Sequence, residues 1–147
     1  MKPIPCLSLL FAFLFSSFSG LVSAGTGLEM DNPEKVNVVY TIEPDDIPLE
    51  SVQNIITTLA CDTGIKLGLR SDAQLFVRVE KHAGLYLLYL DFNRALFYNA
   101  NGTQHSTKGF VWGRYANNID SQDELLEDLA FFAEEFFSDY RKANNLK

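Results

Sequence analysis

The chain has 147 residues, a formal net charge of −7 with neutral histidines, and a hydrophobic fraction of 47%. An acidic surface repels phosphate backbones and anionic headgroups, which speaks against a nucleic-acid-binding protein and against electrostatic binding to a membrane. A length of this order suits one domain with a core of its own.

The N-terminus has the three parts of a secretory signal peptide. The second residue is basic, residues 7–18 are uncharged and mostly apolar, and Val22-Ser23-Ala24 places small residues at a cleavage site. We therefore expect residues 1–24 to be a signal peptide that is removed after its last alanine. The alternative is a retained anchor, because the uncharged stretch over residues 3–28 is long enough to cross about 30 Å of hydrocarbon.

Removal of 24 residues would leave 123 residues, with 11 basic and 19 acidic side chains and a net charge of −8. Of the two cysteines only Cys61 would remain, so the mature chain could not form an intramolecular disulfide. Eukaryotic secreted domains of this size more often carry paired cysteines. The pattern favours export to a bacterial periplasm, with the extracellular space as the alternative, and no membrane association after cleavage.

The mature chain begins with a polar segment. Residues 25–35 contain glycine, asparagine and proline, which predicts a flexible leader before a single domain over residues 36–147. Residues 36–42 are rich in β-branched side chains and predict a strand.

A helix is predicted next. Acidic residues and Pro48 suit its first turn, and apolar residues recur at helical spacing from Leu49 to Leu59. Gly64 is the expected end of this helix.

Three further strands are predicted in the second half of the chain. Residues 74–82 alternate between apolar and polar, residues 85–92 are apolar on both faces except at Asp91, and a last strand covers residues 107–115. Asn101-Gly102 is the strongest hairpin signal, because both residues accept the positive φ of a type I′ turn.

The C-terminal helix has the most complete set of local signals. Ser121 and Glu124 form a capping box, in which each side chain satisfies a free amide at the helix start. An apolar stripe continues to about Ala143, with acidic side chains in the first turns and basic ones in the last. The element order is thus β-α-β-β-β-α. It predicts an α+β fold with a mostly antiparallel four-stranded sheet and two helices on one face.

The C-terminal half resembles a group of small exported bacterial proteins of uncharacterised function. The matching stretches are Phe110-Val111-Trp112-Gly113-Arg114 and Phe136-Phe137-Ser138-Asp139-Tyr140-Arg141-Lys142-Ala143-Asn144. The first stretch departs from the usual order of the group at its Gly-Arg pair. The resemblance covers about residues 74–145 and implies export without a particular activity.

No pattern for catalysis, metal or cofactor binding stands out in this sequence. Cys61 with His82 or His105 would form a thiol dyad if a histidine lay within hydrogen-bonding reach. The cysteine falls near the end of the first helix, whereas reactive thiols favour helix N-termini, so a buried structural cysteine is the preferred interpretation. Both histidines fall near turns and are expected to be solvated. We predict no catalytic residue, no metal ligand and no cofactor.

Asp91 interrupts an apolar strand, and a buried carboxylate needs a partner. Arg78 or Arg94 could supply that partner as a structural ion pair. The alternative is a pocket around Asp91, Arg94 and Trp112, which would make the protein a small-ligand-binding domain or a minor hydrolase.

Strand 85–92 has two apolar faces, but two helices can cover only one face of a sheet. We expect the uncovered face to contact another protein or a second copy of the chain, since exposed apolar patches commonly mark interfaces. The residues assigned to this interaction face are Tyr86, Leu88, Leu90, Phe92 and Trp112, with Leu85, Leu87 and Tyr89 on the opposite face. Core packing is the alternative role for the aromatic residues. The leading hypothesis is an exported, non-catalytic domain that acts by protein–protein interaction or self-association.

Overall fold

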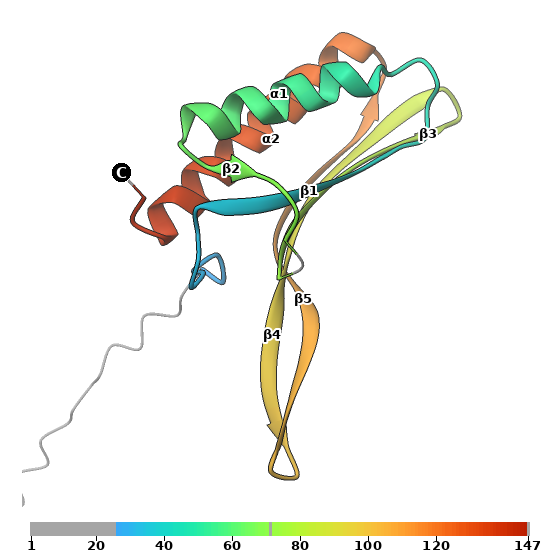
Figure 1. Ribbon diagram of the computed structural model, residues 1–147. Helices are drawn as coiled ribbons and strands as arrows, with labels where there is room; N and C mark the ends of the chain where they lie inside the picture. The colour runs from blue at the N-terminus through green and yellow to red at the C-terminus, as the bar shows by residue number, and fades with distance from the viewer. Residues whose placement is uncertain (1–25, 71, 147) are drawn as a thin grey trace, which may run out of the picture.

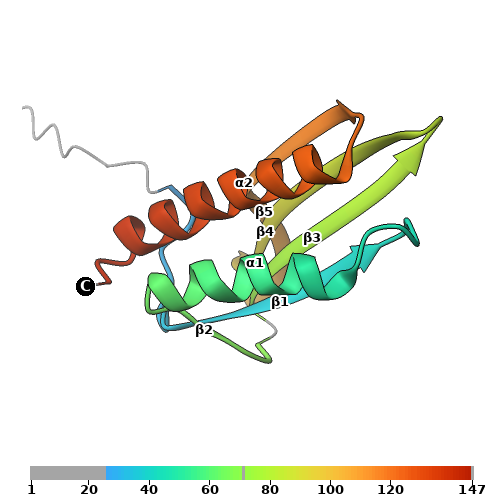
Figure 2. The same cartoon turned by 90° about the horizontal axis from the view of Figure 1, so that it is seen from above.

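The computed structural model describes residues 26–70 and 72–146, so the predicted signal peptide lies outside the described residues. Within these ranges the chain forms five strands and two helices (Figure 1). Their bounds are β1 Lys35–Ile42, α1 Leu49–Asp62, β2 Lys66–Leu67, β3 Ala73–His82, β4 Leu85–Ala100, β5 Thr103–Ile119 and α2 Gln122–Ala143. Both helices lie on the same face of one sheet, which confirms the predicted α+β class and its helix layer (Figures 1 and 2).

The sheet is mixed, in the order β2-β1-β3-β4-β5, so the predicted four-stranded and mostly antiparallel sheet is only partly right. β1 runs parallel to both neighbours, pairing Lys35 with Lys66 of β2 and Val39 with Phe76 of β3. The cause is α1, because a helix between two strands returns the chain to the end where the first strand began. β2 was not predicted, since two residues are too few to carry a periodic signal.

Helix α1 packs one apolar stripe on the sheet and ends in a glycine turn. The buried residues of this stripe are Val52, Ile56 and Ala60. Gly64 follows with a φ of +73°, which suits glycine, and its amide donates to the Cys61 carbonyl oxygen at 2.9 Å. The predicted end of this helix is therefore confirmed.

Helix α2 begins and ends where its sequence signals predict. The amide of Glu124 donates to Ser121 Oγ at 3.2 Å, and the Glu124 carboxylate accepts from the Asp120 amide at 3.3 Å. At the other end, the helix stops at Ala143. The buried residues of its stripe are Leu125, Leu129, Ala133, Phe136, Phe137 and Tyr140.

The core lies between the two helices and the helix-facing side chains of β1, β3 and β4. Phe92 of β4 packs against two rings of α2, with centroids 5.2 Å from Phe136 and 5.6 Å from Tyr140. Full burial of a large apolar side chain contributes about 1.5–3 kcal/mol, so these contacts fix which face of the sheet the helices cover.

β4 and β5 form a hairpin longer than the two predicted strands. Asn101 and Gly102 connect them with φ values of 53° and 76°, which confirms the predicted turn. β3 begins opposite Arg94, and beyond that point the hairpin continues as a two-stranded arm that projects from the rest of the sheet (Figure 1).

The polar segment before β1, predicted as a flexible leader, packs against the domain from its first described residues. Leu28 is buried, and its carbonyl oxygen accepts from Asn144 Nδ2 at 2.8 Å. Asn144 Oδ1 in turn accepts from the Met30 amide at 2.7 Å. Arg94 Nη1 donates to the carbonyl oxygens of Gly27 and Glu29 at 3.0 and 2.5 Å. We call these contacts the N-terminal clasp; they hold the described part of this segment against the domain.

Candidate functional site

The face of the sheet that points away from the helices is the candidate site. Successive side chains of a strand point to opposite faces, so the neighbours of the core residues in β3, β4 and β5 point outward. We call this surface the open face. Its large apolar residues are Phe76, Leu85, Leu87, Tyr89, Phe110 and Tyr115.

Three adjacent strands contribute to the open face in register. Phe76 of β3 lies opposite Asp91 of β4, which lies opposite Gly113 of β5. One row further along, Tyr89 lies between Arg78 of β3 and Tyr115 of β5. Aromatic side chains from the three strands therefore lie on the same face of the sheet, in neighbouring rows.

Two aromatic side chains on β5 are largely exposed on this face. Phe110 is 65% exposed and Tyr115 is 69% exposed. The outward residues Phe76, Leu87 and Tyr89 are half-buried by their neighbours. Sequence reasoning missed both β5 residues as candidates. Simple alternation would place Phe110 on the same face as Trp112, and only the irregularity in the pairing of β5 next to Phe92 turns Phe110 to the open face.

The residues assigned by sequence to the interaction face are core residues, which corrects that assignment. Tyr86, Leu88, Leu90 and Phe92 lie beneath the helices and are at most 3% exposed. Trp112 lies on the same side, with its ring centroid 5.2 Å from that of Phe136 in α2. Strand 85–92 is apolar on both faces, so its sequence could not tell which of the two the helices would cover.

Asp91 points to the open face and has neither of the predicted partners. Arg94, three positions along an extended strand, points to the opposite face and donates to the N-terminal clasp. The guanidinium of Arg78 lies 4.2 Å from the centroid of the Tyr89 ring, and its Nε lies 3.5 Å from Glu80 Oε1. The predicted ion pair of Asp91 is therefore wrong.

The predicted pocket around Asp91, Arg94 and Trp112 also does not form, because the sheet separates these side chains. Asp91 lies on the open face, while Arg94 and Trp112 lie on the helix-covered face. Partial burial raises the pKa of the Asp91 carboxyl above its ordinary value, and the positive charge of Arg78 opposes this shift.

Gly113 leaves space for two side chains of the open face. A Cβ at this position would lie 2.6 Å from Phe110 Cε2 and 2.7 Å from Asp91 Oδ1. The ring and the carboxylate thus meet above the glycine backbone. We call the place formed by Asp91, Phe110 and Gly113 the Asp91 notch.

Cys61 is exposed, so its predicted burial is wrong. It lies at the end of α1 beside β2, whereas the β3–β4 turn that carries His82 lies at the other end of the sheet (Figure 1). His82 Nε2 lies 3.3 Å from Glu80 Oε2, and His105 stacks on Tyr98 in the arm. These positions give no thiol–imidazole dyad. The described ranges also contain no group of three or more potential metal ligands.

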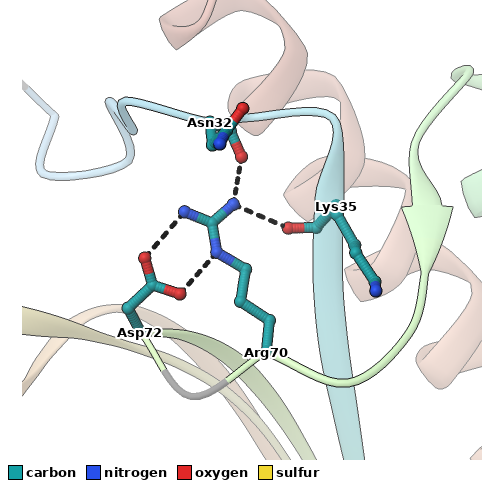
Figure 3. A network of polar contacts seen from close by, with 4 residues as sticks. All are labelled: Asn32, Lys35, Arg70 and Asp72. Atoms are coloured by element: carbon teal, nitrogen blue, oxygen red, sulfur yellow. Dashed lines mark hydrogen bonds and ion pairs between the residues drawn. The ribbon is translucent and has the colours of Figure 1, made fainter.

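Arg70 makes a polar network that the sequence did not predict (Figure 3). It pairs with Asp72 through two bonds, Nε to Oδ1 at 2.5 Å and Nη2 to Oδ2 at 2.8 Å. Its Nη1 donates to the carbonyl oxygens of Asn32 and Lys35. The pairing raises the pKa of Arg70 and lowers that of Asp72. Because four donor contacts are already used, the network has a structural role, joining the segment before β3 to the start of β1.

A second network lies at the opposite end of the sheet. Lys81 Nζ and the Tyr86 hydroxyl both donate to Asp46 Oδ2, at 2.5 and 2.7 Å. These bonds lower the pKa of Asp46 and raise that of Lys81. The network ties the loop before α1 to the β3–β4 hairpin.

Comparisons with known proteins give a weak resemblance of fold. No protein-family profile and no curated protein sequence matches the chain. A solved structure described as a minor lipoprotein from Acinetobacter baumannii has 12% identity and a TM-score of 0.30, covering 78% of this chain and 93% of its own. An uncharacterized protein has 16% identity and a TM-score of 0.30, covering 74% and 86%. No functional argument rests on these similarities. Neither of the described helices is long and apolar enough to cross a membrane.

Proposed function

We propose that this chain is an exported, non-catalytic domain that binds a protein partner through the open face of its sheet. The observation that carries the proposal is the set of aromatic side chains that three neighbouring strands place on one face, with Phe110 and Tyr115 65% and 69% exposed. Contiguous apolar patches of this kind commonly mark interfaces, whereas single exposed apolar residues are ordinary.

The chemistry of the open face agrees with this role. Tyrosine, phenylalanine and arginine are enriched at protein interfaces, and all three residue types occur here. The Arg78 guanidinium lies over the Tyr89 ring, so a charged group and an aromatic ring are presented side by side on this face. Burying one large apolar side chain contributes about 1.5–3 kcal/mol, so a few such contacts suffice for specific binding.

A different protein is a better partner than a second copy. The chain after the predicted cleavage site carries 11 basic and 19 acidic residues, and two such copies repel each other. A catalytic role has less support, because the polar networks of Arg70 and Asp46 serve to join segments of the fold. The small-ligand alternative loses its basis with the separation of Asp91 from Arg94.

Site-specific photocrosslinking tests the proposal in the native host. We expect a benzoylphenylalanine in place of Tyr115 to give a discrete adduct with one other protein, identified by mass spectrometry. The matched control has the same group in place of Phe131, which is 58% exposed on α2 in the helix layer. We expect no such adduct there.

The result that would overturn the proposal is an equal adduct from both positions, or none from the open face. An adduct of two copies of the chain would replace the different partner with self-association. A variant with Phe110→Lys and Tyr115→Lys should lose the interaction while its circular dichroism spectrum stays unchanged, because neither side chain is buried. If instead it unfolds, the open face is part of the core and the proposal fails.

A further inference from the structure

The Asp91 notch has the features of a receptor for a positive charge. Asp91 lies on the central strand of the open face, between Phe76 and Gly113 in register. Its Oδ1 and the Phe110 ring both lie over Gly113. Within residues 26–70 and 72–146, the only charge found to act on this carboxyl is that of Arg78, and no hydrogen bond to it is present.

A carboxylate in this position is partly desolvated. Partial burial removes water from it, and desolvation of an anion is unfavourable unless a donor replaces the water. The raised pKa of Asp91 has the same cause. A guanidinium or ammonium group would supply charge-assisted hydrogen bonds, and the Phe110 ring beside the carboxylate would contact the alkyl part of the same side chain.

The basic side chains near the open face are already occupied. Arg78 contacts Glu80 and the Tyr89 ring, and Lys108 Nζ donates to Gln74 Oε1 at 2.6 Å. A second copy would bring the same occupied side chains together with its own excess of acidic residues. A divalent cation would need several oxygen ligands, whereas the notch offers one carboxylate. The complementary group is therefore a basic side chain of another protein.

We propose that the Asp91 notch receives an arginine or lysine side chain of the protein partner. This inference rests on the proposed function and specifies how the open face recognises its partner. The exposed aromatic residues would contribute buried area, and Asp91 would select a partner with a basic residue at the centre of its contact surface.

The test uses a small probe and does not depend on knowing the partner. The mature protein is titrated with N-acetyl-arginine N-methylamide while its backbone amides are followed by NMR. We expect saturable shifts at Gly113 and Phe110 with a Kd in the range of about 1–10 mM, as suits one ion pair and one ring contact. The citrulline analogue, which has nearly the same shape without the charge, should bind at least about tenfold more weakly.

Two variants complete the test. Asp91→Asn should lower the affinity for the arginine probe by at least about tenfold, because the charge-assisted bond is lost. The control, Glu134→Gln on the exposed surface of α2, should leave it unchanged. Equal binding of the citrulline probe, an unchanged affinity in Asp91→Asn, or shifts spread over the acidic surface of α2 would each overturn the inference.

Failure of this inference can be told apart from failure of the proposed function. If Asp91→Asn leaves the crosslink at Tyr115 at full yield and the arginine probe does not bind, the open face still binds a partner but Asp91 does not select it. If the crosslink at Tyr115 is absent from the wild-type chain, the proposed function itself fails, whatever the probe does.

Discussion

At the scale of single residues, two carboxyl groups of the sheet region lie in opposite environments. Partial burial without a hydrogen bond raises the pKa of Asp91. The two bonds from Arg70 lower the pKa of Asp72. A shifted pKa links folding to protonation, so the two groups should affect stability in opposite directions at neutral pH.

Asp91→Asn is expected to stabilise the protein at neutral pH. A carboxyl whose pKa is higher in the folded state than its ordinary value of 3.8 favours folding only when protonated. Its contribution is complete below 3.8 and is lost as the pH rises through the folded-state pKa. The uncharged amide of Asn avoids this loss. The free energy of unfolding should therefore rise by about 1 kcal/mol or less, because the Asp91 carboxyl is still partly solvated. Melting temperatures measured from about pH 3 to pH 8 should show a difference that closes at the acid end.

Asp72→Asn is the matched control for that measurement. Its lowered pKa means that the charged form favours folding, so this contribution is present above 3.8 and is lost as the pH falls through the folded-state pKa. The variant should melt below the wild type at neutral pH, and this difference should also close in acid. If Asp91→Asn behaves like Asp72→Asn, the carboxylate of Asp91 has a stabilising partner and the interpretation of the notch is wrong.

The sequence could predict the importance of Asp91 but not its surroundings. A charged residue within an apolar strand can be recognised from the local sequence alone. Asp91 and Arg94 are three residues apart, and residues at this spacing on a regular strand point to opposite faces of the sheet. The alternation of the strand therefore already disfavours an ion pair between them. Arg78 was a reasonable candidate, but the Tyr89 ring and Glu80 hold its guanidinium instead.

At the scale of elements, the features that were predicted correctly have local causes. The start of α2 follows from Ser121 and Glu124, and the hairpin turn follows from Asn101 and Gly102. By contrast, the parallel pairing of β1 with β3 depends on residues about forty positions apart, such as Val39 and Phe76. No short segment carries a signal for such a pairing, so the mixed sheet and β2 could not be predicted from periodicity.

Ser121→Ala is expected to destabilise the domain by about 0.5–2 kcal/mol, because the Glu124 amide loses its side-chain acceptor. The free energy of unfolding is measured by urea denaturation. Ser121→Asn, which retains a capping acceptor, should restore most of the loss. An unchanged unfolding free energy in Ser121→Ala would show that the first turn of α2 is not coupled to global stability.

At the scale of the whole molecule, the two faces of the sheet have different tasks. On the helix-covered face, the buried ring of Phe92 packs against Phe136 of α2, and this contact helps hold the layers together. The open face carries Phe110 and Tyr115. These side chains are largely exposed, so they contribute little buried apolar surface to the stability of the fold. The polar networks of Asp46 and Arg70 fasten the ends of the sheet. This division leaves the open face free for the proposed partner.

Under the proposal of export, the mature protein is expected to begin at Gly25. The N-terminal clasp involves residues from Gly27 onward, so cleavage after Ala24 would keep every contact of the clasp in the mature chain. Intact mass and N-terminal sequencing of material isolated from the exporting cell check this. A species that retains residues 7–18 would contradict cleavage and support an anchored form.

The N-terminal clasp should contribute to the stability of the entire domain, because it connects the two ends of the chain. Asn144 bonds Leu28 and Met30, 116 and 114 positions away, and Leu28 is buried. Asn144→Ala leaves two partly buried backbone groups without partners, each at a cost of about 1–3 kcal/mol. We therefore expect a loss of about 2–6 kcal/mol in urea denaturation and faster hydrogen exchange at the Met30 amide. Asn145→Gly on the neighbouring exposed position serves as a control for helix-end effects, since glycine accepts the φ of 51° at this position and the Asn145 side chain makes no bond to the clasp. If both variants lose the same stability, the loss reflects the end of α2, and the first residues of the mature chain are not fastened to the domain by Asn144.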